Sequence, residues 1–584
     1  MKKPSGKKDP ARSFRARAGG QTLKCGVVGA LPIINRVIER MRLAEFLETY
    51  LPAPDSRSKV STEQGLLVLL RNILLSREPI YGLGEWAESF AADLLGLGPC
   101  QAKNLNDDCV GRCLERLFDA DYPSMIIALM THVVKEFDVE LDQLHNDSTT
   151  ISFHGSYDDA KAGASQRGKP TLAVTHGHNK DHRPDLKQLL FILTVARDGG
   201  LPIYFTAADG NVTDDTTHRN TWDLMCQLVG ARDFLYVADS KLATAGNMAY
   251  IHQGGGRFVT LLPRTRAEHA AFRTSAQERK IEWKELWTRS DDDGEILDVY
   301  RIYAQPAITS EGYRLLWIHS MGKQENDALG RSKRMKSALG KLSKLGDRLR
   351  SPRTRFRQRT KVASAVSEIL DHYRCNGLIE VEITELEEES YKQETPGRPG
   401  KDTRYIRSTS NRFKINNRIE EAAVGRDATT DGVFALVSND RDLSDPEVLK
   451  AYKKQPKVEK RFSQFKSDYE VAPVYLKNVA RIEALMCTYF LALLTESLIE
   501  REMRLAMVAE GLDSIPLYPE GRSCKRPCTR RVLDLFGNIQ RHELTGPEQE
   551  PLTMITDLSA IQRQVLGLLK VPRRSYGQPV NINR

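Results

Sequence analysis

The sequence lacks the cysteine pattern of a secreted, disulfide-stabilised protein. It has nine cysteines among 584 residues, an odd number spread without the spacing of a disulfide framework. Cys109/Cys113 and Cys524/Cys528 are isolated pairs with no second pair to match, so we do not expect a zinc site. This cysteine usage predicts a reducing compartment, and we expect the protein in the cytoplasm.

Long apolar runs are also absent. The basic N-terminus leads into Gly19 and Gly20 instead of an apolar stretch, so no signal peptide is predicted. The most apolar segment, residues 484–494, is too short to cross a bilayer and is flanked by Glu483 and Glu496. We therefore expect a soluble protein with no membrane partner.

Positive charge is concentrated in two places. The net charge of +9 is modest for this length, but residues 2–17 contain seven basic residues against one aspartate, and residues 323–361 form a denser basic block. Clustered positive charge favours a polyanionic partner, although a solvated basic face is the alternative. The chain is too long for one compact core, and three or four domains are expected.

The hydrophobic pattern changes its period at residue 139. Residues 25–138 have helical periodicity, and Ser61–Gln64 has the form of a capping-box helix start. Strands are then predicted at 139–153, 189–196, 201–205, 234–238 and 258–262, with one helix before the fourth and one after it. This is the element order of a ribonuclease-H-like α/β sheet, which has three antiparallel strands, a helix, a parallel strand, a helix and a last strand. In that sheet Asp147 on the first strand and Asp239 after the fourth lie side by side.

A polar helix face is predicted over residues 452–466. It carries Tyr452, Gln455, Glu459 and Lys466. A neighbouring apolar stripe that can anchor the helix consists of Val458, Phe462 and Phe465. Pro456 belongs near the first turn of a restarted helix, and a kink there could rotate Tyr452 and Gln455 off this face. An ordinary amphipathic helix with a solvated face is the alternative.

Two aspartates on neighbouring strands and a glutamate on a packed helix suit a two-metal site for phosphoryl transfer. Hard divalent ions take oxygen ligands, and two ions about 3.5–4 Å apart can activate an attacking oxygen and stabilise a leaving one. The predicted catalytic and metal-binding residues are Asp147, Asp239 and Glu459. The main alternatives are Asp209, Asp214 and Asp215, for which turn and N-cap roles are the simpler explanation.

Four stretches of the chain resemble the DDE transposases of bacterial insertion sequences. They are Asn146–Thr149, the block Gly177–Gln188, Val237–Lys241, and the spacing of Tyr452, Gln455, Glu459 and Lys466. The spacing is similar to the Tyr-Arg-Glu-Lys signature of the IS-four superfamily. Within that superfamily, the chain most resembles the IS-sixteen-thirty-four type. The resemblance covers most of residues 25–570. It departs at Gln455, where the signature has Arg.

The resemblance implies a ribonuclease-H-like (retroviral-integrase-like) catalytic domain interrupted by an insertion domain. It implies an enzyme that uses Mg²⁺, or Mn²⁺ as a substitute, to cut DNA at the element ends and join them to target DNA. The implied partners are terminal inverted repeats, target DNA and a second copy in a homodimer, in a bacterial cytoplasm at the nucleoid. The expected DNA-binding residues are Tyr452, Gln455, Lys466, Lys241, Arg353, Arg355, Arg357 and Arg359.

Six segments are expected along the chain. They are a basic disordered tail (1–24), a helical N-terminal domain that is a candidate for DNA binding (25–138), the first part of the catalytic domain (139–263), a mixed α/β insertion domain with the basic helical block (264–430), the second catalytic part with the Glu459 helix (431–510), and a C-terminal region for DNA or dimer contacts (511–584). Within the insertion, Trp283, Trp287 and Trp317 are expected to pack in a core, which is favoured over stacking on an unpaired base.

A non-catalytic DNA-binding relative of such an enzyme is the alternative function. The three intact acids favour the enzyme, because a relic has no reason to keep three dispersed carboxylates. Terminal inverted repeats beside the gene would discriminate the two.

Overall fold

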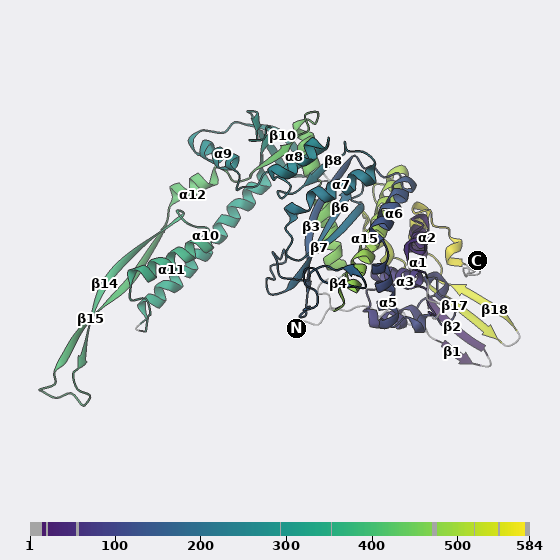
Figure 1. Cartoon of the computed structure of the whole chain (residues 1–584), viewed down its shortest axis with the longest axis horizontal. Coiled ribbons are helices and arrows are strands. Elements are labelled where there is room, and N and C mark those ends of the chain that lie inside the picture. Colours follow the sequence, from purple (N-terminus) through teal and green to yellow (C-terminus); the bar gives the residue numbers. More distant parts are fainter. Residues whose placement is uncertain are drawn as a thin grey trace. The chain divides into compact units, whose positions relative to one another are not determined.

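The computed structural model divides the chain into two compact units (Figure 1). One unit comprises residues 1–260 and 450–584, and the other comprises residues 261–449. The residues that the structure describes are 15–18, 21–53, 58–291, 294–351, 353–469, 476–518, 520–546 and 549–577.

Helices form the N-terminal part of the first unit, where helical periodicity predicts them. Ser61 starts one of these helices with the predicted capping box, in which its hydroxyl accepts from the Gln64 N–H and its own N–H donates to the Gln64 side chain. The helices are α1 (Leu31–Arg40), α2 (Leu43–Tyr50), α3 (Thr62–Leu75), α4 (Leu83–Glu88), α5 (Asp107–Asp119) and α6 (Tyr122–Glu136), with short 3₁₀ turns η1 (Ile80–Gly82), η2 (Ala92–Leu95) and η3 (Ala102–Asn104).

The long helix α15 (Val479–Ala509) is the centre of this unit. Helices α1, α3 and α5 and strand β7 (Pro202–Asp209) pack against it. It is long and apolar enough to cross a membrane, but 94% of its most apolar stretch is buried inside the fold. Its apolar character therefore reflects a core position. Shorter helices follow it: α16 (Thr529–Asp534), α17 (Ala560–Leu568) and α18 (Arg574–Gly577).

A small antiparallel sheet joins the two ends of the chain. Its strands, in order, are β1 (Arg15–Ala18), β2 (Gln21–Val27), β17 (Gln540–Gly546) and β18 (Gln549–Ile555). The prediction of a disordered tail over residues 1–24 is therefore wrong for 15–18 and 21–24, and its other residues lie outside the described part. Strand β2 is ordered by pairing with β17, more than 500 residues away, which local composition does not reveal.

The main sheet of the first unit has the predicted strand order. Its strands are β3 (Gln143–Phe153), β6 (Lys187–Ala196), β7, β8 (Leu235–Ala238) and β9 (Arg257–Leu261). They run in the order β7-β6-β3-β8-β9, antiparallel from β7 to β3 and parallel from β3 to β9. The turn η4 (Asp214–Thr216) and helix α7 (His218–Val229) precede β8, and α8 (Ala245–Gln253) follows it. A two-residue pair, β4 (Ser165–Gln166) and β5 (Lys169–Pro170), lies in the loop before β6.

The chain returns to the first unit through helical segments. Helix α13 (Asp445–Tyr452) ends at Tyr452, α14 (Pro456–Ser463) begins at Pro456, and the π-helical turn η5 (Gln464–Asp468) continues it. Pro456 is thus a first-turn residue of a restarted helix, as its fixed φ and missing N–H require.

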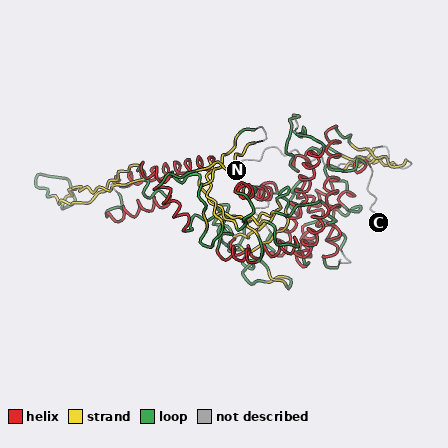
Figure 2. Tube along the Cα trace, turned by 90° about the horizontal axis from the view of Figure 1, so that it is seen from above, coloured by secondary structure: helices red, strands yellow, loops and turns green. Residues whose placement is uncertain are grey.

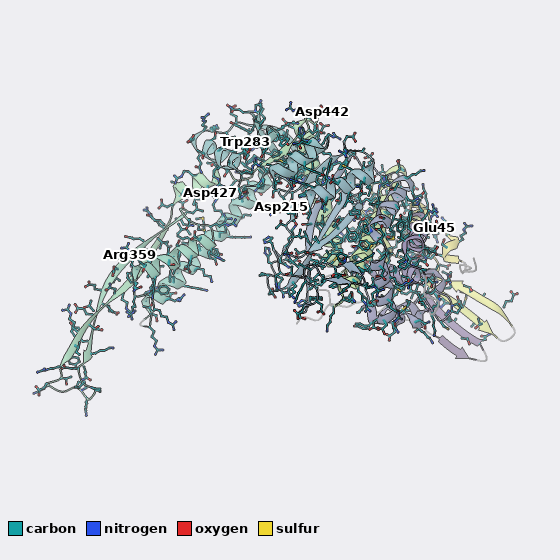
Figure 3. All side chains as sticks on the ribbon, viewed as in Figure 1. Glu45, Asp215, Trp283, Arg359, Asp427 and Asp442 are labelled. Carbon is teal, nitrogen blue, oxygen red and sulfur yellow. The ribbon has the colours of Figure 1, made fainter. Side chains whose placement is uncertain are left out.

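The second unit combines a sheet with an arm. The sheet order is β10 (Trp283–Ser290), β11 (Ile296–Tyr303), β13 (Arg314–Ser320), β16 (Val433–Ser438), with β12 (Ala307–Ile308) beside β13 and α9 (Ala267–Glu278) packed nearby. Trp317 has the expected core position: it is buried and stacks on Phe272 with centroids 4.0 Å apart. Trp287 is half-buried and stacks on Tyr300. Trp283, which is labelled in Figure 3, has its ring centroid 6.4 Å from that of Phe272.

The arm of the second unit consists of two helices and a long hairpin. Helices α10 (Met321–Arg350) and α11 (Arg359–His372) pack on the base of the hairpin β14 (Ile379–Gln393) and β15 (Tyr405–Ile419), followed by α12 (Glu421–Ala428). Their shared core includes Leu342, Leu345, Val362 and Phe413. Figure 2 shows the hairpin continuing past both helices.

Two boundaries in this region differ from the prediction. The second unit spans 261–449 where an insertion at 264–430 is expected, because β16 pairs along its length with β13. The basic block 323–361 is not one helix, since α10 ends at Arg350 and α11 begins at Arg359.

Candidate active site

Asp147 and Asp239 lie at the same level of two adjacent parallel strands. Strands β3 and β8 pair in register up to Asn146 and Ala238. Asp147 directly follows Asn146, and Asp239 directly follows Ala238. Asp147 Oδ1 accepts from the Ser148 N–H at 2.7 Å, and Asp239 Oδ1 accepts from the Lys241 N–H at 2.9 Å. Strand register alone therefore brings the two predicted aspartates together.

Burial gives both carboxyl groups raised pKa values. Desolvation is the main cause for Asp147, and with the nearby Asp239 charge it outweighs Lys180 and raises the pKa to about 6. The pKa of Asp239 is also raised, first by burial, while the Lys241 N–H and the Lys180 charge lower it. Two carboxylates with raised pKa values form a site that is short of positive charge.

Tyr452 connects the aspartates to Glu459. Burial first, and then the charges of Asp239, Glu459 and Asp147 in that order, raise the pKa of its hydroxyl to about 12. The charges of all three predicted acids therefore act on one phenol. Glu459 itself is exposed on the first turn of α14.

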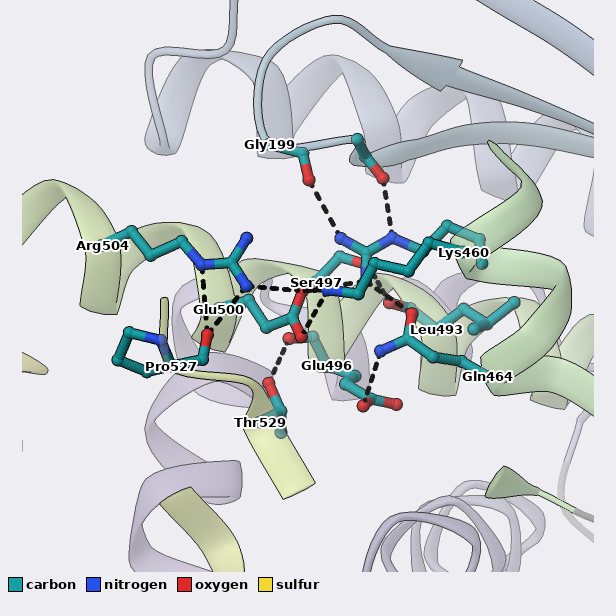
Figure 4. A network of polar contacts seen from close by, with 12 residues as sticks. Gly199, Lys460, Gln464, Leu493, Glu496, Ser497, Glu500, Arg504, Pro527 and Thr529 are labelled. Carbon is teal, nitrogen blue, oxygen red and sulfur yellow. Dashed lines mark hydrogen bonds and ion pairs between the residues drawn. The ribbon is translucent and has the colours of Figure 1, made fainter. Parts of the chain in front are cut away.

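A buried ion pair fixes the helix that carries Glu459 (Figure 4). Arg461 Nη1 donates to Glu500 Oε2 of α15 at 3.0 Å, and each side chain is 1% exposed. Arg461 Nε and Nη2 donate to the carbonyls of Gly200 and Gly199 at 2.8 and 3.0 Å. Lys460 also binds Glu500, at 2.9 Å. Helix α14 is thus joined to α15 and to the β6–β7 turn.

The predicted apolar stripe of this helix is confirmed. It is formed by Val458, Phe462 and Phe465, all of them buried. The Phe465 ring stacks on Phe191 of β6 with centroids 4.5 Å apart. The stripe holds α14 and η5 against the sheet while Glu459 stays exposed.

The expected common face of Tyr452, Gln455, Glu459 and Lys466 does not form. The helix breaks at residues 453–455, and Gln455 turns inward and is 7% exposed. Its Oε1 lies 3.1 Å from His145 Nδ1 and its Nε2 donates to the Asn146 carbonyl at 3.1 Å. The amide is therefore used inside the protein, next to Asp147, and is not presented to DNA.

A neutral His145 explains why Gln stands at position 455. Burial lowers the pKa of His145 to about 4. The ring accepts from Gln143 at Nε2, so Nδ1 carries the proton and donates to the Gln455 oxygen. Arg has no acceptor for this proton, so Gln455, which has one, is the residue that suits the neutral His145 beside it.

Lys466 and Lys241 have different surroundings. Lys466 Nζ, on η5, binds both carboxylate oxygens of Asp181 at 2.7 and 2.8 Å. Lys241 is exposed in the turn after β8. The block Gly177–Gln188 thus has a structural role, since it carries Asp181 to Lys466.

Asp214, one of the alternatives to the three predicted acids, shares Lys180 with Asp147. Lys180 Nζ is 3.0 Å from Asp214 Oδ2 and 3.8 Å from Asp147 Oδ1. The other two alternatives have structural contacts, although not as helix caps: the Asp209 side chain accepts from the Ala173 N–H, and the Asp215 carbonyl accepts from Asn247. Lys180 and Asp214 are joined by the tertiary fold, and their distance in sequence gives no signal of this.

The donor chemistry fits a hard divalent cation. Asp147 and Asp239 offer oxygen ligands, and a cation would offset the burial and repulsion that raise their pKa values. Among the described residues, no group of three or more His, Cys, Asp or Glu side chains is arranged to hold a metal. The structure thus supplies two adjacent ligands, and Glu459 is linked to them only through its charge effect on Tyr452.

The four predicted DNA-binding arginines of the second unit are exposed. Arg353, Arg355 and Arg357 lie in the connection between α10 and α11, and Arg359 begins α11 (Figure 3). Phe356 anchors this connection by packing on the arm's core, with Arg348 over its ring.

Comparisons with known proteins cover most of the chain. Residues 142–495 match the model of the transposase DDE domain family, which is more than half of the chain, and residues 23–131 match a domain of unknown function (DUF4277). A search of curated proteins finds no match. A solved piggyBac transposase synaptic complex with hairpin DNA aligns at 8% identity and a TM-score of 0.26, over 53% of this chain and 63% of that one. The alignment spans less than two thirds of that protein, and so weak a likeness carries no argument.

Replacing Gln455 with Ala is expected to loosen strand β3. The change leaves the His145 Nδ1–H and the Asn146 carbonyl unpaired in a buried place, which costs about 1–3 kcal/mol. Hydrogen exchange of β3 peptides, followed by mass spectrometry, should show a corresponding loss of protection. Gln227→Ala, at an exposed position of α7, is the matched control. Unchanged β3 protection in Gln455→Ala would contradict this role.

Proposed function

The chain belongs to the transposase DDE domain family, and we propose that it cuts DNA at the ends of an insertion sequence and joins those ends to target DNA. The observation that carries this proposal is the pairing of β3 with β8, which sets Asp147 beside Asp239. Electrostatic coupling of Tyr452 to Asp239, Glu459 and Asp147 supports a site made of all three acids.

The finer fold assignment is also part of the proposal. The strand order β7-β6-β3-β8-β9, with the last three strands parallel, supports a ribonuclease-H-like catalytic domain. We retain the IS-four superfamily and its IS-sixteen-thirty-four type as the branch, on the spacing of Tyr452, Glu459 and Lys466. The buried Gln455 is this chain's own variant of the signature.

The family implies dependence on a divalent metal, and we assign its ligands to Asp147, Asp239 and Glu459, with Mg²⁺ as the metal and Mn²⁺ as its substitute. When bound, such ions activate the attacking oxygen and stabilise the leaving oxygen in phosphoryl transfer. The protein itself supplies a rigid frame: β3 and β8 hold the aspartates, and Arg461 holds the Glu459 helix. Burial around Asp147 and Asp239 strengthens their attraction for a cation by excluding water.

DNA is the proposed substrate, as terminal inverted repeats and as target. Tyr452 and Lys241 interact electrostatically with the acids, and Lys466 pairs with Asp181. We assign all three side chains to the backbone of the cut end. The exposed arginines between α10 and α11 would hold flanking phosphates, and a homodimer would hold two ends together. A cytoplasmic protein at the bacterial nucleoid is consistent with this substrate.

Removing any one of the three acids is expected to abolish cleavage. Asp147→Asn, Asp239→Asn and Glu459→Gln should each lower the cleavage rate by roughly 10³-fold or more, with double changes adding little, because the residues act as a unit. The assay incubates the protein with the gene's own flanking DNA and Mg²⁺ or Mn²⁺ and measures nicks at defined ends.

Asp209→Asn is the matched control, because the Asp209 carboxylate, on β7 and two strands away from β3, accepts from the Ala173 N–H. DNA binding should survive in all four variants. A wild-type protein that binds the ends without nicking them would favour the non-catalytic DNA-binding alternative. An Asp239→Asn protein that still cleaves while Asp209→Asn does not would refute the assignment of the second aspartate.

Neutralising the exposed arginines of the second unit is expected to weaken DNA binding of any sequence. Changing Arg353, Arg355, Arg357 and Arg359 to Gln should lower affinity for specific and random duplex alike. The salt dependence should flatten by roughly one unit of log–log slope per lost phosphate contact. The control changes Arg350, Arg407 and Arg418, which already pair with acids in the same unit. An unchanged slope in the first variant would assign these arginines to a solvated surface.

A further inference from the structure

The loop before β6 is tied to β3 immediately beyond Asp147. Asn179 Nδ2 donates to the buried Ser152 hydroxyl at 3.1 Å, and the Lys180 N–H donates to Thr150 Oγ1 at 3.2 Å. Asn179 Oδ1 in turn accepts from the Asp181 and Arg183 N–H groups and folds the loop on itself. These bonds fix the backbone of Lys180 over the strand that carries Asp147.

The Lys180 ammonium is held by several oxygens at once. It donates to the carbonyl and to the hydroxyl of Ser148, both at 2.7 Å. Asp214 Oδ2 lies 3.0 Å away and Asp147 Oδ1 lies 3.8 Å away. The Lys180 side chain is 32% exposed and the Asp214 side chain is 15% exposed. This is a partly buried, fully coordinated ammonium, unlike an exposed lysine in a single surface pair.

We propose that Lys180 is a built-in counter-charge of Asp147, anchored by Asp214 and Ser148, which sets the affinity of the carboxylate site for divalent cations. The inference rests on the proposed function, because it takes Asp147 and Asp239 as the metal ligands. Lys180 and Asp214 are positioning residues here, acting through Asp147.

The geometry gives the two residues opposite effects. A positive charge 3.8 Å from Asp147 repels an incoming cation and competes with it for the carboxylate. Asp214 draws the ammonium towards itself and adds a negative charge to the same cluster, so it favours cation binding. A lysine that only braces the loop would not produce effects of opposite sign in the two variants.

Mn²⁺ binding to the full-length protein tests this inference without any cleavage assay. Electron paramagnetic resonance of free Mn²⁺ gives the dissociation constant. We expect Lys180→Met to bind Mn²⁺ on the order of tenfold more tightly, Lys180→Arg to stay near wild type, and Asp214→Asn to bind several-fold more weakly, as unit charges a few ångströms apart require. The matched control is Asp215→Asn, which should not change binding.

The outcomes separate this inference from the proposed function. If wild type binds Mn²⁺ and Asp147→Asn does not, the metal site stands. In that case the role of Lys180 is overturned, and the metal site is kept, by either of two results. One is that Lys180→Met binds Mn²⁺ as wild type does or more weakly. The other is that Asp214→Asn has the same Mn²⁺ dissociation constant as Asp215→Asn. If Asp147→Asn binds like wild type, the proposed metal site itself fails. Lys180→Gln, which keeps a donor for Ser148, replaces the Met variant if circular dichroism shows that the latter is unfolded, and it should also tighten binding.

Discussion

The buried pair of Arg461 and Glu500 is the constraint on which the site's third acid depends. Both side chains are almost completely removed from water, a state that is tolerable only when every charged atom has a partner. Arg461 meets this condition through Glu500, Gln464 and the carbonyls of Gly199 and Gly200. Those carbonyls are turned towards it by a tight turn in which both glycines have φ near +65°, a backbone state that disfavours other residues. Removing one charge of such a pair typically costs 3–5 kcal/mol.

This pair links elements that come from distant parts of the chain. Helix α14 brings Glu459, the β6–β7 turn belongs to the sheet that holds Asp147, and α15 is the core helix of the unit. Because Glu459 is exposed, its position is set by Arg461 two residues later and by the packing of Val458. The buried residues Val458 and Arg461 that hold the helix are thus close in sequence to the exposed Glu459.

Local patterns were enough to predict the strands and the two aspartates. Alternation and apolar runs predict β3, β6, β7 and β8, and the order of these strands in the chain predicts which of them are neighbours. The position of Asp147 beside Asp239 follows from that order. The start of α14 was also predictable, because Pro456 has few other places in a helix. Of the three tryptophans in the second unit, Trp317 has the expected core position, whereas Trp283 and Trp287 are only half-buried.

Long-range contacts account for what the patterns missed. Gln455 is drawn inward by His145, which lies 310 positions earlier in the chain, and helical periodicity cannot show this. Lys180 reaches Asp214 because a loop folds over β3, and β2 pairs with the distant β17. Each of these features depends on a partner whose place is decided by the tertiary structure.

Anomalous scattering from Mn²⁺ would test the central claim most directly. Crystals of the full chain with DNA of its own element end would be grown in Mn²⁺, and the metal positions located from the anomalous signal. The account predicts Mn²⁺ bound by Asp147 and Asp239, with Glu459 of the same chain completing the ligands. Mn²⁺ found only at other acids, such as Asp209 and Glu483, with Asp147 and Asp239 left without metal beside bound DNA, would contradict it.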